Sequence, residues 1–223
     1  MDRRTAIIIP VKGSDPKSRL SGLLSLAERK QLQVAMLEDT LQTLIKAGRA
    51  KDAFVVSSDL ALLEFTERFG ANTVAEPGDQ GVNSAVERGI AASSSFESHM
   101  VIPADLPLLS VQDLKAASML VREGAKLVIS PSEGFDGTNL LLLTKEGRLE
   151  LHYDDDSFRK HVAGATSLGI PVAMYYSRGT SFDVDKAEDV HRFFKYHKAG
   201  STLTFLGRTL RRTRRLPTHR SQG

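Results

Sequence analysis

The chain contains no cysteine and no tryptophan among its 223 residues. Without cysteine there are no disulfides, no thiolate nucleophiles and no cysteine-based zinc or iron–sulfur sites. A reducing, cytoplasmic setting fits this composition. No hydrophobic run approaches the ~20 residues that span a bilayer. The apolar stretch after Arg4 is also too short for the core of a signal peptide. We therefore expect no membrane partner.

The usual glycine-rich phosphate-binding sequences are missing as well. No G-x-G-x-x-G follows the first apolar segment, and no G-x-x-x-x-G-K-[ST] occurs anywhere. Neither a Ser–His–Asp order nor a nucleophile elbow is present. Five histidines show no i, i+4 metal-binding spacing and are expected on the surface: His99, His152, His191, His197 and His219. A phosphate ligand would have to be held chiefly by side-chain charge.

The net charge of +3 belongs to one end of the chain. Residues 201–223 hold six arginines and no acid, so residues 1–200 contain 24 basic and 27 acidic side chains. Such a tail is able to bind nucleic acid or acidic membranes. We prefer the simpler interpretation of a flexible C-terminal extension without a nucleic-acid partner. The arginines are Arg208, Arg211, Arg212, Arg214, Arg215 and Arg220.

Apolar strand-like segments alternate with helix-like segments every 20–30 residues. This alternation is typical of a doubly wound, three-layer α/β fold with a mostly parallel sheet and helices on both faces. We expect residues 1–200 to form one domain of this kind. The alternation breaks after Ser130, where residues 138–143 are strand-like with no helix before them, which predicts an antiparallel insertion. Expected strands are 6–9, 53–57, 72–75, 100–103, 127–130, 138–143 and 172–175; expected helices are 25–48, 59–70, 82–90, 110–123, 157–168 and 187–197.

A basic loop follows the first strand. Pro10 ends the strand, and Lys12, Lys17 and Arg19 lie in the turn-rich residues beyond it. Ligands of open α/β sheets bind outside the carboxyl ends of the strands, so these cations predict an anionic ligand such as a nucleoside triphosphate. Lys17 and Arg19 are the candidates to stabilise a leaving pyrophosphate. The alternative is a solvated surface loop.

Carboxylates follow two later strands. Asp105 stands between Pro103 and Pro107, and Asp183 alternates with Asp185 on an extended segment. Mg²⁺ favours one or two carboxylates together with phosphate oxygens and water, so these three aspartates are candidate metal ligands. The alternatives are that Asp105 caps the turn before Ser110 and that Asp185 caps the helix beginning at Lys186.

Two polar segments belong to the insertion region, 136–139 and 153–161. Thr138 and Ser157 offer hydroxyl groups, and Ser157 begins a helix whose free N–H groups favour an anion. Asp154, Asp155 and Asp156 come just before it and would repel an anion unless they turn away or bind metal. Solvated loops are the alternative for both segments, and Asn83 is able either to contact a nucleoside or to cap the helix that begins near it.

Five short motifs occur in order: Ile-Pro-Val-Lys with Lys-Ser-Arg-Leu, Pro-Ala-Asp-Leu-Pro, Asp-Gly-Thr-Asn, Ser-Phe-Arg-Lys-His and Phe-Asp-Val-Asp. In residues 5–200 the chain resembles the 2-phospho-L-lactate guanylyltransferase family, which has the nucleotide-diphospho-sugar transferase fold. This resemblance implies transfer of a guanylyl group from GTP, with Mg²⁺, to 2-phospholactate on the route to coenzyme F-420. Bacterial relatives use phosphoenolpyruvate, and relatives suggest a homodimer.

The resemblance also implies residue roles. The acceptor substrate is assigned to Thr138, Asn139, Asp154 and Ser157, and the metal to Asp105, Asp183 and Asp185. The nucleotide is assigned to Pro10, Val11, Lys12, Lys17, Glu76, Asn83 and Asp105, of which Lys17 and Asp105 are catalytic together with Arg19.

One loop departs from the family pattern. Relatives often carry Phe-Gly-x-Gly-Ser where this chain has Tyr153-Asp154-Asp155-Asp156-Ser157. This departure concerns the acceptor and not the nucleotide chemistry. A molybdenum-cofactor or sugar-phosphate acceptor is the alternative within the same fold, and a nucleic-acid binder acting through the arginine tail is the alternative of a different class.

Overall fold

A computed structural model describes residues 5–196 and 199–212 of the chain. Seven strands form one sheet in the order β3-β2-β1-β4-β6-β5-β7. Strand β6 runs antiparallel to both of its neighbours, β4 and β5, and the other pairs are parallel. The expected antiparallel insertion is confirmed. The strands are β1 (Thr5–Pro10), β2 (Ala53–Ser57), β3 (Asn72–Ala75), β4 (Ser98–Val101), β5 (Leu127–Pro131), β6 (Thr138–Thr144) and β7 (Val172–Met174).

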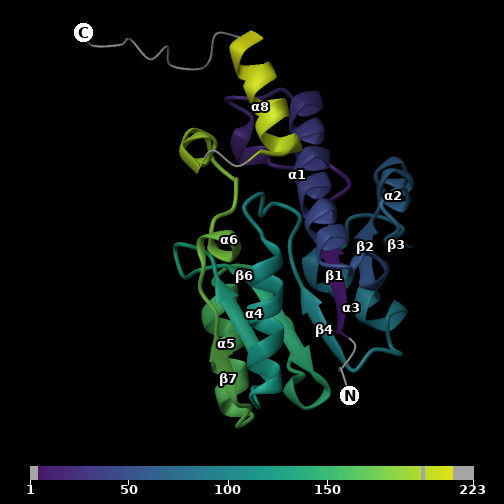
Figure 1. Cartoon of the computed structure of the whole chain (residues 1–223), viewed down its shortest axis with the longest axis vertical. Helices are drawn as coiled ribbons and strands as arrows, with labels where there is room; N and C mark the ends of the chain where they lie inside the picture. Colours follow the sequence, from purple (N-terminus) through teal and green to yellow (C-terminus); the bar gives the residue numbers. More distant parts are fainter. Residues whose placement is uncertain (1–4, 197–198, 213–223) are drawn as a thin grey trace, which may run out of the picture.

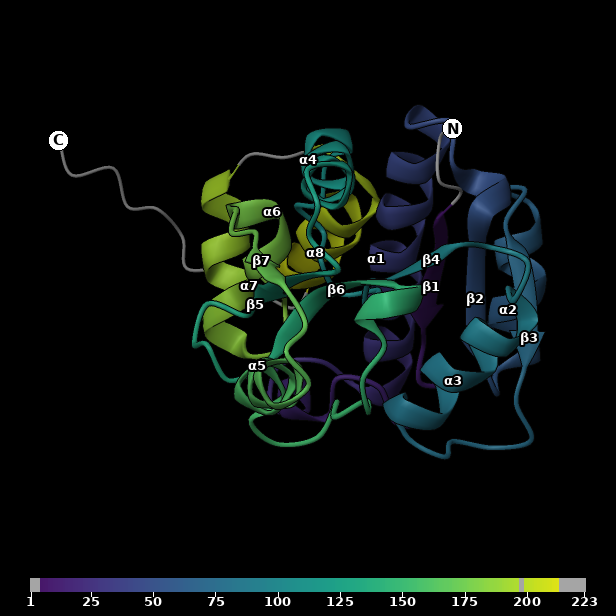
Figure 2. The same cartoon turned by 90° about the horizontal axis from the view of Figure 1, so that it is seen from below.

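Helices cover both faces of this sheet, which confirms the three-layer α/β prediction. In β1, Ile7 and Ile9 pack with α1, α2 and α4, whereas Ile8 points to the opposite face and packs with α3 and α5. A central strand with both faces buried has to be apolar at every position. Figure 2 shows α4 on one side of the strands and α3 and α5 on the other. These helices are α1 (Leu26–Lys46), α2 (Leu60–Glu67), α3 (Val82–Ala92), α4 (Val111–Arg122) and α5 (Ser157–Ser167).

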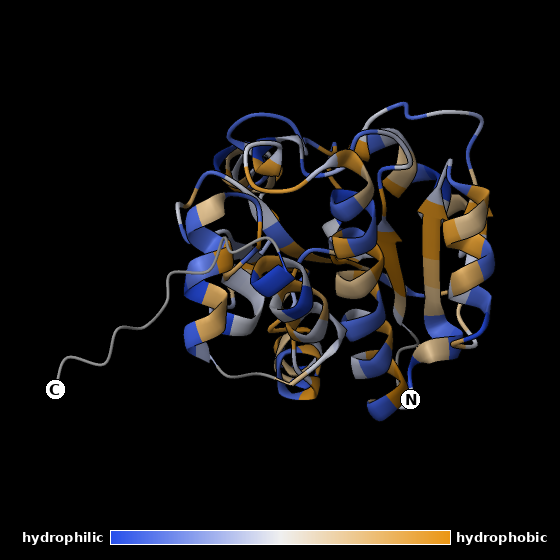
Figure 3. Cartoon of the chain, turned by 90° about the horizontal axis from the view of Figure 1, so that it is seen from above, coloured by the Kyte–Doolittle hydropathy of each residue, from blue (hydrophilic) through white to orange (hydrophobic). Residues whose placement is uncertain are grey.

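Side-chain caps fix where several helices begin. Ser25 and Glu28 form a capping box at α1, and Asp59 accepts a hydrogen bond from the backbone of Leu62 at α2. Each cap satisfies backbone N–H groups that have no partner within the helix. Both helices begin within one residue of the predicted starts at 25 and 59. Figure 3 shows the apolar strands lying between helices of mixed hydropathy.

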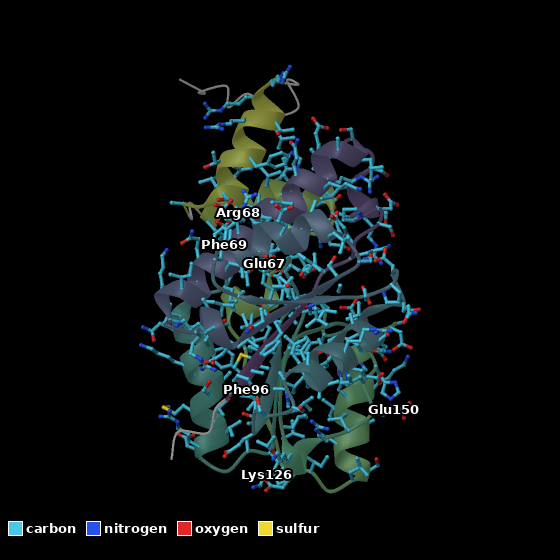
Figure 4. All side chains as sticks on the ribbon, turned by 90° about the vertical axis from the view of Figure 1, so that its right-hand side faces the viewer. Glu67, Arg68, Phe69, Phe96, Lys126 and Glu150 are labelled. Carbon is cyan, nitrogen blue, oxygen red and sulfur yellow. The ribbon has the colours of Figure 1, made fainter. Side chains whose placement is uncertain are left out.

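The parallel strands all direct their carboxyl ends toward the same end of the molecule. Figure 4 shows Phe96 and Lys126, which precede β4 and β5, in the lower part, so these two strands run upward. Loops after β1, β4 and β5 therefore gather at the upper edge of the sheet. Two short helices also lie beyond β7, α6 (Arg178–Ser181) and α7 (Ala187–Phe193). The expected helix 187–197 is shorter than predicted, because a 3-10 turn (Phe194–Tyr196) replaces its end and His197 lies outside the described residues.

The expected flexible tail is wrong for residues 201–212, which form helix α8 (Ser201–Arg212). Leu206 and Leu210 are fully buried in a cluster that includes Leu32 and Met36 of α1. Figure 1 shows α8 beside α1 at the upper end of the molecule. The arginines lie on the exposed side of the helix, so the apolar face decides the structure. Arg214, Arg215 and Arg220 lie outside the described residues.

An α1 side chain also fixes the beginning of α8. The Asp39 carboxylate accepts hydrogen bonds from the backbone N–H of Ser201 at 2.7 Å and of Thr202 at 3.0 Å. A groove of about 820 Å³ runs between the two helices. Within the described residues, no helix is both long and apolar enough to cross a bilayer.

Candidate active site

Three loops that are distant in sequence bring charged side chains together at the upper edge of the sheet. Lys17 Nζ lies 2.5 Å from Asp105 Oδ2 and 3.6 Å from Asp185 Oδ1. Arg19 Nη1 lies 2.6 Å from Asp185 Oδ2. The backbone N–H of Val184 donates to the carbonyl of Asp105 at 3.2 Å and ties two of the loops to each other. We call Lys17, Arg19, Asp105, Asp183 and Asp185 the charged cluster.

Mutual charge controls ionisation inside the cluster. Burial alone would lower the pKa of Lys17, but the charge of Asp105 and its hydrogen bond hold that pKa above its ordinary value. Burial and the Asp105 charge raise the pKa of Asp183 to about 6. Burial works against the ionised form of Asp185 too, yet Lys17 and Arg19 keep the pKa of this carboxyl low. The cluster therefore holds an ammonium ion among carboxylates of unequal acidity.

Both capping alternatives for these aspartates are excluded. Ser110 is the N-cap of α4, in a capping box with Asp113. The backbone N–H groups of Asp185 and Lys186 donate to Asp189, which lies in the first turn of α7. The Asp105 and Asp185 side chains are consequently available for the charged cluster.

The loop after β1 does not offer a backbone cradle for phosphate. Asp79, from the loop between β3 and α3, accepts hydrogen bonds from the N–H groups of Gly13 at 3.0 Å and Ser14 at 2.8 Å. It also accepts from the hydroxyls of Ser14 and Ser58. A carboxylate already occupies the donors that a glycine nest would present. Sequence reasoning missed Asp79, because its role depends on partners from two other loops.

A cavity of about 360 Å³ opens beside this loop. Its walls combine apolar side chains with two carboxylates, a size and composition suited to a small organic ligand. The predicted nucleotide residues Pro10, Val11, Lys12 and Glu76 line it, but Asn83 does not. The lining residues are Pro10, Val11, Lys12, Glu76, Asp79, Gly81, Val82 and Ala85.

Asn83 serves another purpose. Its Oδ1 accepts a hydrogen bond from the backbone N–H of Tyr153 at 2.7 Å, so it joins α3 to the loop before α5. The N-cap of α3 is Gly81, which has no capping side chain. The capping alternative for Asn83 is therefore wrong, and its carbonyl oxygen is already used within the protein.

On the other side of the charged cluster, the predicted acceptor residues meet. The backbone N–H of Thr138 donates to Ser157 Oγ at 2.8 Å, and the two hydroxyl oxygens lie 3.3 Å apart. Asn139 Nδ2 donates to the carbonyl of Ser181 at 3.2 Å. All three side chains are buried. A neighbouring cavity of about 390 Å³ includes Arg19, Asn139, Asp154, Asp183 and Asp185 in its lining.

His161, on α5, fixes the hydrogen bonding of Thr138. The backbone N–H of His152 donates to His161 Nε2 at 2.9 Å, so this nitrogen carries no proton. The proton of the neutral ring is then on Nδ1, which donates to Thr138 Oγ1 at 3.0 Å. Burial lowers the pKa of His161 to about 4, which keeps the ring neutral. Because Thr138 Oγ1 accepts this hydrogen bond, the Thr138 hydroxyl proton is available to donate to a ligand.

The acidic loop before α5 lines the cavity of about 390 Å³, and two of its three aspartates are paired with cations of α5. Lys160 Nζ lies 3.1 Å from Asp154 Oδ2, and Arg159 Nη1 lies 3.1 Å from Asp156 Oδ1. Asp156 has a φ of 58° and stands where relatives carry the second glycine of their loop. Aspartate adopts this left-handed conformation more readily than most residues. This chain thus has a residue suited to the left-handed conformation at position 156.

The surface prediction for histidines is wrong for His99, which is 3% exposed and hydrogen-bonded to the carbonyl of Ser93. The absence of i, i+4 histidine spacing excludes a metal-binding helix face, but it does not indicate whether His99 is buried. Within residues 5–196 and 199–212, no group of three or more His, Asp or Glu side chains forms a ready-made metal cage.

Solved structures share this fold. A protein from Desulfovibrio desulfuricans G20 assigned to the nucleotide-diphospho-sugar transferases matches with a TM-score of 0.77 at 16% identity, over 95% of this chain and 97% of that one. A nucleotidyl transferase from Methanothermobacter thermautotrophicus matches with a TM-score of 0.60 at 14% identity, over 86% and 96%. These likenesses confirm the predicted fold.

Sequence comparison goes further. The chain is 32% identical over 200 residues to the 2-phospho-L-lactate guanylyltransferase of Methanocaldococcus infernus, covering 89% of this chain and 88% of that one. It is 35% identical over 188 residues to the phosphoenolpyruvate guanylyltransferase of Rubrobacter xylanophilus, covering 83% and 91%. The family model described as guanylyl transferase CofC like matches residues 5–218. With the charged cluster, the cavity of about 360 Å³ and the Thr138 and Ser157 hydroxyls at one edge of this sheet, the chain belongs to the CofC-like guanylyl transferase family.

Proposed function

We propose that this chain transfers a guanylyl group from GTP to (2S)-2-phospholactate, giving lactyl-2-diphospho-5′-guanosine and pyrophosphate for coenzyme F-420 biosynthesis. The observation that carries the proposal is the order of the strands, which sets Lys17 and Asp105, after β1 and β4, between the cavity at the loops of β1 and β3 and the buried Thr138–Ser157 pair at β6. Guanylyltransferases for both phospho-acids are relatives of this chain. Phosphoenolpyruvate is the second candidate acceptor.

The reaction exchanges one phosphorus–oxygen bond for another. An oxygen of the acceptor phosphate attacks the α-phosphorus of GTP, the bond from the α-phosphorus to the bridging oxygen breaks, and pyrophosphate leaves with that electron pair. The acceptor phosphate is already an anion near pH 7, so no general base is required. Catalysis then depends on positioning and electrostatic stabilisation.

The chain supplies both. Lys17 and Arg19 are the cations closest to the carboxylates, and they would hold the β- and γ-phosphates of GTP. The Thr138 hydroxyl proton and the N-terminus of α5 would hold the acceptor, although the Phe158 N–H of this helix already donates to the Asp136 carbonyl. Asp154 and Asp156 are paired with Lys160 and Arg159, which reduces their repulsion of an anionic acceptor.

The donor set of the cluster fits Mg²⁺. Asp105 Oδ1 is buried and has no hydrogen-bond partner among the described residues. Asp183 lies close enough to Asp105 for the charge of Asp105 to raise its pKa. Mg²⁺ takes one or two carboxylates and fills its remaining positions with water and phosphate oxygens, so a three-carboxylate cage is not needed. Asp105 and Asp183 would hold the ion, with Asp185 beside them. When bound, Mg²⁺ neutralises charge on the α-phosphate and on the oxygen that leaves it.

A substrate matrix tests the proposal. Four nucleoside triphosphates are combined with 2-phospholactate, phosphoenolpyruvate, a sugar phosphate and molybdopterin in the presence of Mg²⁺, and pyrophosphate release is measured. We expect GTP with 2-phospholactate to give the highest kcat/KM. Preference for phosphoenolpyruvate would change the acceptor only, whereas no release from GTP with any phospho-acid would refute the proposal.

The same assay tests the carboxylate. Asp105→Asn should lower kcat by roughly 10²-fold or more, as expected for the loss of an electrostatic stabiliser. Asp52→Asn is the matched control, because Asp52 pairs with Arg49 before β2 at the other end of the strands. Near-normal turnover of Asp105→Asn would remove Asp105 from the mechanism. The homodimer implied by relatives stays a prediction for sedimentation analysis.

A further inference from the structure

Glu76 is a buried carboxylate to which no described residue donates a hydrogen bond. It follows β3 directly, and its backbone N–H donates to the carbonyl of Ser57 at 3.1 Å, which extends the sheet by one hydrogen bond. The residue is 8% exposed and lines the cavity of about 360 Å³. Its Oε2 is inaccessible and has no hydrogen-bond partner among the described residues.

Among the described residues, no charged neighbour of Glu76 forms an ion pair or a hydrogen bond with its carboxylate, although Lys12 lines the same cavity and Arg88 Nε is buried without a partner. Asp79, the other carboxylate of the cavity, is saturated by Gly13, Ser14 and Ser58. Arg88, on α3, directs Nη2 to Gln80 Oε1 at 3.0 Å. Burial and the Asp79 charge raise the pKa of Glu76, and the Arg88 charge only partly offsets them. Leaving a carboxylate buried and unpaired costs free energy that a structural role would avoid. A ligand that enters the cavity and donates hydrogen bonds would recover it.

The cavity favours a flat base with two adjacent donors. Pro10, Val11, Val82 and Ala85 give it apolar walls, and Glu76 would present both acceptor oxygens of its carboxylate to a ligand once the buried Oε2 turns toward the cavity. Guanine presents N1–H and the 2-amino group in the same spacing. Adenine and cytosine each place an acceptor ring nitrogen at this edge, and uracil has one N–H between two acceptors.

We propose that Glu76 selects guanine by accepting hydrogen bonds from N1–H and the 2-amino group of the base. This inference rests on the proposed function, because it assumes that the cavity receives the nucleoside of GTP. It assigns base selection to one side chain at the carboxyl end of β3. The charged cluster, which holds phosphate and metal, then contributes to turnover without distinguishing one base from another.

The test compares base analogues at fixed acceptor. GTP, inosine triphosphate and xanthosine triphosphate are assayed by pyrophosphate release with 2-phospholactate, or with phosphoenolpyruvate if the wild type prefers it. Inosine lacks the 2-amino group, so wild-type kcat/KM should fall by about tenfold or more relative to GTP. Xanthosine carries an oxygen at this position, which should repel the carboxylate and lower kcat/KM further.

Glu76→Gln has nearly the same volume and replaces one acceptor oxygen with a donating amide. We expect kcat/KM for GTP to fall by about tenfold to hundredfold, and the ratio of xanthosine to guanosine triphosphate to rise by at least as much. Asp79→Asn is the matched control, since it changes a carboxylate of the same cavity that already has its partners. It should lower kcat/KM for all three nucleotides without changing their order.

Wild-type ratios among the three nucleotides in Glu76→Gln would overturn the role of Glu76. If the variant turns over none of them, calorimetric titration with GTP and inosine triphosphate decides: equal affinities support the role, and a retained preference for GTP overturns it. A wild-type protein that releases no pyrophosphate from GTP would instead refute the proposed function, so the two failures are distinguishable.

Discussion

Three non-glycine residues of the described chain have a positive φ, and all of them lie in loops at the site. They are Lys17, Phe135 and Asp156. Phe135, in the loop between β5 and β6, stacks on Tyr176 with ring centroids 5.7 Å apart. A left-handed backbone costs free energy for residues with a Cβ and persists only where surrounding contacts require it. The left-handed backbone sets the direction of the Lys17 ammonium group and of the Phe135 ring, and at Asp156 it sets the start of α5.

The Lys17 ammonium group lies against carboxylates that would otherwise be available to a metal ion. It contacts both Asp105 and Asp185. We predict that Lys17→Met raises the affinity of the nucleotide-free protein for Mn²⁺ by about tenfold or more, because it removes one positive charge from these carboxylates. The same variant should lose turnover, since it lacks a phosphate contact.

Electron paramagnetic resonance of free Mn²⁺ measures this affinity without any assay of activity. Lys12→Met is the matched control, because Lys12 is exposed and forms no ion pair with the cluster carboxylates. Equal Mn²⁺ affinity in the wild type and Lys17→Met would show that Lys17 does not compete with the metal.

Two substitutions of His161 separate the roles of its two ring nitrogens. His161→Asn keeps a donor near the Nδ1 position that faces Thr138, whereas His161→Gln reaches the Nε2 position that faces His152. We predict that the glutamine variant raises the KM for 2-phospholactate by about tenfold with little change in the KM for GTP. The asparagine variant should stay within about threefold of the wild type.

Steady-state kinetics with each substrate varied separately check this prediction. A merely structural role for His161 would change both variants alike, or would change the two KM values together. Either pattern would count against orientation of the Thr138 hydroxyl by the ring.

At the scale of elements, the sequence predicted most helices and strands but not α8. Leu203, Leu206 and Leu210 follow helical spacing, so an apolar stripe was visible in the sequence. The basic composition after residue 200 hid it, because a run of arginines with no acid is typical of a disordered arm. The α6 turn could not be predicted, because four residues are too few to show any period.

The α8 stripe gives a stability prediction. Leu206 is fully buried against α1, so Leu206→Ala should lower the free energy of unfolding by about 2–5 kcal/mol. Arg211→Ala, on the exposed side of the same helix, should change it by no more than about 0.5 kcal/mol. Urea denaturation followed by circular dichroism measures both, and equal effects would contradict the packing of α8 on α1.

At the scale of the whole molecule, the sequence located the charged cluster because parallel strands end at one edge of a sheet. Asp105 and Asp183 could be placed there from strand order alone. The bonding of Asp79 and the tautomer of His161 could not, because each depends on backbone groups contributed by segments far along the chain. Sequence patterns predict which side chains lie at the carboxyl ends of the strands. The folded structure is needed to see which of these side chains already have hydrogen bonds or ion pairs within the protein.

Folding of the whole molecule should depend on pH through His161. Its pKa of about 4 in the folded state lies below the ordinary value near 6.5, so the unfolded chain binds more protons between these values. The contribution is therefore fully present above pH 6.5 and is lost as the pH falls toward 4. We predict that the wild type loses up to about 3 kcal/mol more than His161→Asn over this range.

Urea denaturation of both proteins at several pH values isolates this effect, because other titrating groups contribute equally to each. His152, Tyr153 and Asp154 face the same ring and are unchanged in the comparison. Parallel pH profiles for the two proteins would show that His161 is not held neutral by burial.

The packing of α8 on α1 also sets an order of events during synthesis. Helix α1 leaves the ribosome early, yet its Leu32 and Met36 are covered by side chains that are made more than 160 residues later. Until then this apolar surface is available to chaperones or to a second nascent chain. The β5–β6 hairpin, by contrast, joins neighbouring segments and is able to form as soon as both strands emerge. The hairpin that carries Thr138 is thus assembled from local contacts, while the last helix completes an apolar cluster that also contains Leu20 and Val184, next to the charged cluster.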